Sequence, residues 1–248
     1  ASVGTGTAYA SQSSLPADTL YSVKLGTEQF QRILTLDEAA EVELEIKFAG
    51  IRLDELEELA GMSADQAASK KTTQAESIEQ AVAGYENNLN LAITKSKQIG
   101  ENSELIEKVA LAILTHLDRI DEISDKASGA TLQVIANSKA AALNGHLNVI
   151  QNLASFNPVR ANEINLQAIQ SLLERAEIET ARGNGQSAED ALQQMNTLQK
   201  FGSQILDPAG SEGQNHGADN PQNTPGQQQG GPNNTPSNGT TPTATPDG

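Results

Sequence analysis

Residues 41–60, EVELEIKFAGIRLDELEELA, decide between a helical fold and one that contains strands. The opening part of this stretch, EVELEIKF, alternates polar and apolar side chains, which is typical of a half-buried strand. Over the whole stretch, however, apolar residues recur at spacings of 4 and 3, the period of one helix face. No turn signal interrupts the run, and no partner strand appears elsewhere in the sequence. We therefore predict a helix whose apolar face is formed by Val42, Ile46, Ala49, Leu53, Leu56 and Ala60.

Two further stretches repeat this helical spacing of apolar positions. One seam comprises Ile106, Val109, Ile113, His116, Ile120 and Ile123, and the other Leu132, Ile135, Lys139, Ala142, His146, Val149 and Leu153. Aromatic residues make up only 3% of the chain and Trp is absent, so the core must consist mainly of Leu, Ile, Val and Ala. Such a core suits closely packed helices better than a β-sandwich. We predict an all-α fold, an elongated antiparallel bundle of about seven helices.

Capping residues and glycines indicate where these helices begin and end. The starts are marked by Thr35 with Glu38, Ser63 with Gln66, and Asn157 before Pro158, and the stops by Gly61, Gly100 and Gly183. The helices predicted from these signals cover residues 19–34, 36–60, 64–99, 103–127, 130–155, 158–182 and 187–205.

The composition divides the chain into three parts. We expect one helical bundle domain over residues 15–206, with two helical subdomains that meet near residue 100 as the alternative. Residues 207–248 hold 7 of the 9 prolines, 8 of the 20 glycines and no aromatic residue, so we predict a disordered tail. Residues 1–14 precede the domain, and among them Ala8-Tyr9-Ala10 has the small-x-small form of a signal-peptidase site.

Residues 15–24, LPADTLYSVK, are typical of a turn that leads into a helix. Pro16 presets φ for the turn, and Asp18 is placed to cap the free amides of the helix that follows. Leu20, Val23 and Phe30 begin an apolar face of that helix. We take this segment as an architectural signal.

The segment resembles the LPGDxLYPVK opening of a bacterial family of extracytoplasmic domains of unknown function. The matching residues are Leu15, Pro16, Asp18, Leu20, Tyr21, Val23, Lys24 and Glu28, and Phe48, Ala49, Arg52, Leu53 and Glu55 resemble the family's second helix. The family's Gly is Ala17 here, which argues against a turn with positive φ, and its second Pro is Ser22. The resemblance covers about residues 11–60. It implies a domain outside the membrane, after a transmembrane or export segment, as in anti-sigma-factor-like membrane proteins. On this resemblance we interpret residues 1–14 as a juxtamembrane linker. The family has no assigned catalytic or binding residues.

The formal charge of −16 limits the partners that the chain can have. Residues 15–61 carry 4 basic and 11 acidic residues, a balance of −7, whereas residues 128–206 carry 5 and 6, a balance of −1. We expect no nucleic-acid binding, because the sequence has no basic stripe or aromatic platform. No apolar run is long enough to span a membrane, so we expect membrane association only through a segment upstream of Ala1. A protein partner is the expected kind of ligand.

Metal binding and catalysis have few candidate residues. The chain lacks Cys, and His116 and His146 on apolar seams, with Asp118 or Asp121, are the weak candidates for a divalent-metal site. We favour ordinary buried histidines and expect no metal, no cofactor and no enzymatic activity. Tyr21 and Lys24 lie 3 residues apart on one helix face, and we interpret them as packing plus a surface cation.

Three functions remain as hypotheses. The first is a non-catalytic extracytoplasmic helical module that binds a partner or senses a signal, as the ectodomain of a membrane-anchored regulator. The second is a structural spacer of the cell envelope, and the third is a metal-binding bundle centred on His116 and His146. A homo-oligomer is compatible with each of them, because a bundle with one apolar strip left open would dimerise.

Overall fold

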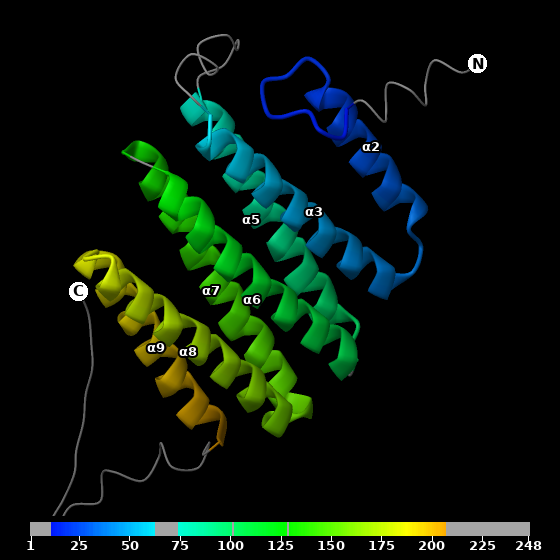
Figure 1. Ribbon diagram of the computed structural model, residues 1–248. Helices are drawn as coiled ribbons and strands as arrows, with labels where there is room; N and C mark the ends of the chain where they lie inside the picture. The colour runs from blue at the N-terminus through cyan, green and yellow to red at the C-terminus, as the bar shows by residue number, and fades with distance from the viewer. Residues whose placement is uncertain (1–10, 63–73, 101, 128, 207–248) are drawn as a thin grey trace, which may run out of the picture. The chain divides into compact units, whose positions relative to one another are not determined.

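The computed structural model describes residues 11–62, 74–100, 102–127 and 129–206 (Figure 1). This part of the chain is all-helical and contains no strand, as predicted. Its seven helices are α2 (Tyr21–Leu34), α3 (Glu38–Ala60), α5 (Gln74–Gln98), α6 (Ser103–Lys126), α7 (Ala130–Phe156), α8 (Pro158–Ala181) and α9 (Gly185–Leu206). The predicted tail over residues 207–248, the start of the predicted linker over residues 1–10, and the Ser63–Gln66 capping box lie outside the described residues.

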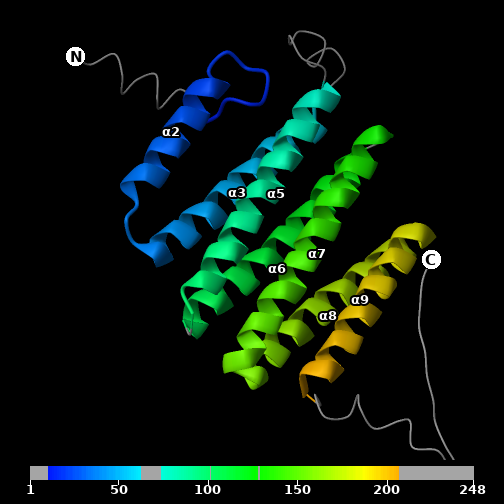
Figure 2. The ribbon, with the colours of Figure 1, turned by 180° about the vertical axis from the view of Figure 1, so that it is seen from behind.

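The helices pack as successive antiparallel pairs, which confirms the predicted bundle. Helix α3 pairs with α5, α6 with α7, and α8 with α9, and the pairs contact one another through α5 on α7, α3 on α6 and α7 on α8. Figure 2 shows the same order from behind, with α2 lying against α3. A single apolar core joins α3, α5, α6, α7 and the start of α8, and a smaller cluster joins α8 to α9.

The stretch that decides the fold is helical throughout, as its period of 3 and 4 predicts. In α3, the side chains of Val42, Ala49, Leu53 and Leu56 are fully buried in the main core. Three charged residues of α3, Glu45, Arg52 and Glu55, are also buried. Helix α3 therefore has two covered faces, one apolar and one charged, and the charged face lies toward α2.

Two helix ends illustrate which capping signals were correct. Asn157 caps α8, since its Oδ1 accepts a hydrogen bond from the Arg160 amide at 3.0 Å and Pro158 follows it. The predicted start at Thr35 is wrong, because Asp37 caps α3 by accepting from the Ala40 amide at 2.8 Å. Thr35 instead ends α2, where both its amide and its hydroxyl donate to the Gln31 carbonyl.

Candidate functional site: a buried charged network beneath an outward apolar helix

The loop over residues 11–20 fastens the start of α2 to the bundle. Leu15 is buried in the main core, and the Pro16 carbonyl accepts a hydrogen bond from the Ser77 hydroxyl on α5 at 3.3 Å. The N-cap position of α2 is Leu20, which has no side-chain cap, and Asp18 closes the turn before it, since its Oδ2 accepts from the Leu15 amide at 2.8 Å. The turn has positive φ at Ala17, 76°, which corrects the expectation drawn from that residue. The side chain of Ala17 is strained there, and the contacts on both sides of it hold the turn.

The face of α2 that lies against the bundle is polar. Tyr21, Lys24 and Glu28 are its buried residues, and Arg32 is half-buried one turn further on. Lys24 is only 6% exposed, so the prediction of a surface cation is wrong. Its Nζ lies 2.7 Å from Glu55 Oε1 and donates to the Ser14 carbonyl at 3.2 Å. Residue 14 thus belongs to the packed structure.

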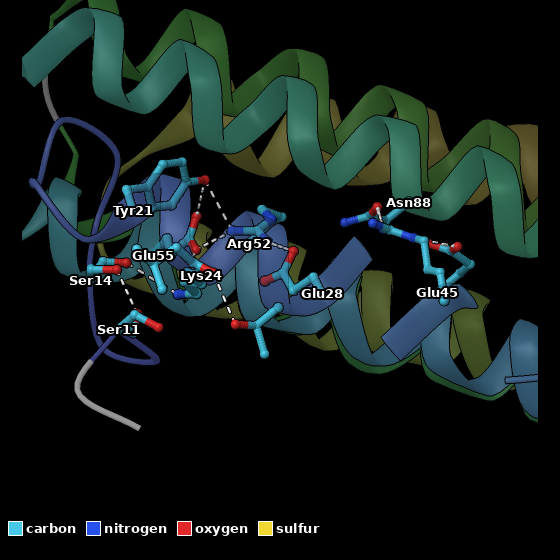
Figure 3. Close-up of polar contacts among 12 residues, drawn as sticks. Ser11, Ser14, Tyr21, Lys24, Glu28, Glu45, Arg52, Glu55 and Asn88 are labelled. Carbon is cyan, nitrogen blue, oxygen red and sulfur yellow. Dashed lines mark hydrogen bonds and ion pairs between the residues drawn. The ribbon is translucent and has the colours of Figure 1, made fainter. Parts of the chain in front are cut away.

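Arg52 of α3 is the centre of the network (Figure 3). Its guanidinium forms ion pairs with Glu28 of α2 and with Glu55 of its own helix. It also donates to the Tyr21 hydroxyl oxygen at 3.0 Å, and that hydroxyl donates to Glu55 Oε2 at 3.1 Å. Gly84 of α5 makes room for Arg52, since a Cβ at this glycine would lie 2.8 Å from the Arg52 Cδ atom.

A second cluster continues the contact toward the end of α2. Arg32 donates from Nε and Nη2 to the two carboxylate oxygens of Glu45, at 2.9 and 3.0 Å. Its Nη2 also donates to Asn88 Oδ1 on α5 at 2.8 Å, and its Cζ lies 4.6 Å from the centre of the Phe48 ring. Figure 3 shows Glu45 and Asn88 beside each other, apart from the Arg52 group. Helix α2 is therefore held at two points along its length.

The charges of the Arg52 group balance one another. Lys24 and Arg52 face Glu28 and Glu55, two positive groups against two negative ones. Burial opposes the charge of Arg52, but Glu55 and Glu28 outweigh it and raise the pKa of the guanidinium. Burial and then the Glu55 carboxylate raise the pKa of Tyr21 far above its ordinary value, so its hydroxyl stays protonated as a donor. These groups suit a fixed contact, because each charge has an opposite charge within reach.

The opposite face of α2 is apolar and exposed. The sequence correctly indicated an apolar face that includes Val23 and Phe30, but that face points away from the bundle. Phe30 is 59% exposed and Ile33 is 63% exposed, and Leu36 in the link to α3 is 88% exposed. We call this surface the outer face of α2; it comprises Ser22, Val23, Gly26, Gln29, Phe30, Ile33 and Leu34.

A pocket of about 310 Å³ lies where the 11–15 loop, α2 and α3 meet. Charged groups of both signs line it, including Lys24, Glu28 and Asp54, together with apolar Leu15 and Phe48. The second carboxylate oxygen of Glu28 accepts no hydrogen bond from any described residue. The pocket is therefore part of the contact between α2 and α3.

The two histidines of the apolar seams are core residues in the structure. His116 is 6% exposed and His146 is fully buried. The ring of His116 packs edge-on against Tyr85, with 5.7 Å between the ring centroids. Neither nitrogen of His146 has a hydrogen-bond partner among the described residues. Burial lowers the pKa of both imidazoles to about 4, with Arg119 adding to the effect at His116.

The aspartates named with these histidines have other partners. Asp118 accepts a hydrogen bond from the Ser171 hydroxyl at 2.6 Å, and Asp121 lies 2.6 Å from the Lys139 ammonium. This pair explains why Lys139 occupies a seam position. In the described ranges, no group of three His, Cys, Asp or Glu side chains is arranged to hold a metal ion.

Sequence reasoning missed the network although its signal was present. In α2 the polar residues Tyr21, Lys24, Glu28 and Arg32 recur at spacings of 3, 4 and 4, which places them on one helix face. Glu28, Arg52 and Glu55 were singled out only as matches to a family pattern. The opposite charges on two consecutive helices indicated a pairing that apolar periodicity does not detect.

Comparison of the chain with known family models, curated proteins and solved structures found no match. The resemblance of residues 11–60 to an extracytoplasmic family therefore stays a prediction. None of the described helices is both long and apolar enough to cross a membrane.

Proposed function

We propose that this chain is a non-catalytic helical module that binds a protein partner through the outer face of α2. The observation that carries the proposal is the reversed orientation of that helix, with its charged side chains directed toward α3 and its large apolar side chains in solvent. Following the resemblance of residues 11–60, we place the module outside the cytoplasm, as the ectodomain of a membrane-anchored regulator.

The outer face has the chemistry of a helix that docks into a partner. Burying one large apolar side chain contributes about 1.5 to 3 kcal/mol, so a solvated Phe30 and Ile33 leave that stabilisation unused within the chain. Contiguous exposed apolar groups on a folded protein mark interaction sites. Val23, Phe30 and Ile33 are 7 and 3 residues apart, spacings that place them on one side of the helix, as the anchors of a helix in a groove are placed.

The remaining two hypotheses have less support in the structure. A spacer through the cell envelope needs no apolar row on its surface, and α2 presents one. A metal-binding bundle needs histidines that a solvated ion reaches, whereas His146 is fully buried.

Photocrosslinking tests the proposal. A photoreactive phenylalanine analogue at Phe30 should form a covalent adduct with another protein molecule in cells that produce the chain. The matched control places the same analogue at Leu166, an apolar residue of α8 that is 53% exposed. An adduct at position 30 and not at 166 supports docking on α2. No adduct at position 30 would contradict the proposal and favour the spacer.

A further inference from the structure

We propose that the partner of the outer face of α2 is a second copy of this chain, which packs its own α2 against it around a two-fold axis. The inference rests on the proposed function, that α2 is a docking surface, and names the occupant. It is carried by the charge of the outer face, by Gly26, and by the composition of the rest of the chain.

The outer face carries no charge at all. The three charged residues of α2, Lys24, Glu28 and Arg32, all lie on the side of α3. Seven residues remain on the outer face, and each of them is apolar, small or neutral polar. A two-fold contact brings each surface against itself, so a face with an excess of one charge sign would repel its copy. In a chain of net charge −16, an uncharged helix face is a surface on which two copies can meet without like-charge contact.

Gly26 lies at the centre of this face, one turn from Val23 and from Phe30. Its backbone is helical, and a Cβ added there would meet nothing within 4 Å. A glycine inside a helix costs about 1 kcal/mol relative to alanine, so this position weakens α2 without serving a turn or a contact in the described structure. A missing side chain at the middle of an apolar face lets a second helix approach closely.

Few apolar residues in the remaining segments of this sequence could cover the outer face of α2. The segments outside the described residues contain only Val3 and Tyr9 as large apolar side chains. A membrane surface fits poorly, because helices that lie on membranes carry lysines or arginines on their polar side, exposed to lipid headgroups. In α2 both cations, Lys24 and Arg32, are paired with Glu55 and Glu45 of α3.

Sedimentation of the full chain over a range of concentrations tests the pairing. We expect a concentration-dependent species of twice 26.1 kDa. The double variant Phe30→Glu with Ile33→Glu should raise the dimer dissociation constant at least ~100-fold, because each copy loses two central apolar contacts and gains like charges. Leu166→Glu on α8 is the matched control and should leave the dissociation constant unchanged.

The absence of cysteine allows a second measurement that does not depend on those substitutions. Gln29→Cys places one thiol on the outer face, and Gln193→Cys places one on the exposed side of α9. A disulfide forms only where two Cα atoms come within about 7 Å. Mild oxidation should link two copies through position 29 and not through position 193.

Three results would overturn the inference. The first is a monomer at every concentration with no disulfide at position 29. The second is a dimer that tolerates Phe30→Glu with Ile33→Glu but is lost in Leu166→Glu. The third is a monomer that floats with neutral phosphatidylcholine vesicles. A monomer whose position 30 still crosslinks to a different protein would overturn self-pairing while it supports the proposed function, so the two failures are distinguishable.

Discussion

Helices α2 and α6 are both amphipathic, but they face the bundle in opposite ways. Helix α6 directs Ile106, Ile113 and Ile120 into the core, where each is fully buried. Helix α2 directs its charged groups inward and leaves Phe30 in solvent. Apolar packing is non-directional and strong, whereas a network of ion pairs fixes register and leaves little net stabilisation after desolvation. The difference teaches that charged contacts position α2 on the bundle and that its apolar face stays exposed.

The largest effect is expected from a substitution of Arg52, the centre of the charged network between α2 and α3. Arg52→Ala leaves Glu28 buried without a cation and leaves Glu55 with Lys24 alone, which should lower the free energy of unfolding by about 3 to 5 kcal/mol. Chemical denaturation measures the change. Arg119→Ala is the control, because Arg119 pairs with Asp54 and Glu57 near the surface and should cost about 1 kcal/mol or less. If both variants lowered the free energy of unfolding equally, the buried network of α2 would be no different in energy from a surface ion pair, and its contrast with the apolar core would lose its basis.

The apolar side of the comparison is tested by Ile113→Ala in α6. The variant removes a fully buried side chain and should cost about 3 kcal/mol, from lost burial and the cavity left behind. Hydrogen exchange should separate it from Arg52→Ala, since the core variant accelerates exchange in α5, α6 and α7 together. The Arg52 variant should accelerate exchange most strongly in α2. Uniform acceleration by both variants would show that α2 is not a separate cooperative unit.

Acid should destabilise the core through its two histidines. The pKa of His116 and of His146 lies at about 4 in the folded state, against 6.5 in an exposed imidazole. Their stabilisation is therefore complete above pH 6.5 and is lost as the pH falls from 6.5 toward 4, by roughly 1 kcal/mol per pH unit for each histidine. His146→Leu should roughly halve this slope in denaturation curves measured across the window. An unchanged slope would show that His146 does not titrate with unfolding.

A smaller effect of either sign is expected at Gly26. At concentrations where the chain is monomeric, Gly26→Ala should stabilise α2 by about 1 kcal/mol, because the added methyl meets no neighbour. At concentrations where copies pair, the same methyl should weaken the dimer in sedimentation experiments. If Gly26→Ala stabilised both the monomer and the dimer, the proposed close approach of a second helix at Gly26 would be contradicted.

The smallest expected effect lies in the loop before α2. Ala17 has φ of 76°, a conformation that glycine adopts without a steric cost. Ala17→Gly should raise the free energy of unfolding by about 0.5 to 1 kcal/mol, since relief of strain exceeds the added flexibility of the unfolded chain. Thermal unfolding checks the sign, and a loss of stability would show that the turn is not strained.

Local patterns were enough for most of the fold. The period of residues 41–60 outweighed their short strand-like alternation, and Asn157 with Pro158 marked the start of α8 correctly. The prediction for Thr35 was wrong because a threonine in a link between two helices can hydrogen-bond to the end of the first or to the start of the second. Only the structure shows that its hydroxyl bonds to the end of α2. The histidines were placed on apolar seams correctly, while the contact of His116 with Tyr85 lies between α6 and α5, and spacing along one helix does not show it.

The sequence by itself determined which segments are helical and which face of α2, α3, α6 and α7 is apolar, because both depend on spacing along a single helix. The tertiary structure alone decided which of the two faces of α2 the bundle covers. Its apolar face could have packed on the core, and its charged face could have paired with α3. Burial of Lys24 and Glu28 is favourable only where Glu55 and Arg52 of α3 are positioned to neutralise them. The pairing groups lie on different helices and come together only in the folded bundle, so spacing along α2 does not show which face is covered.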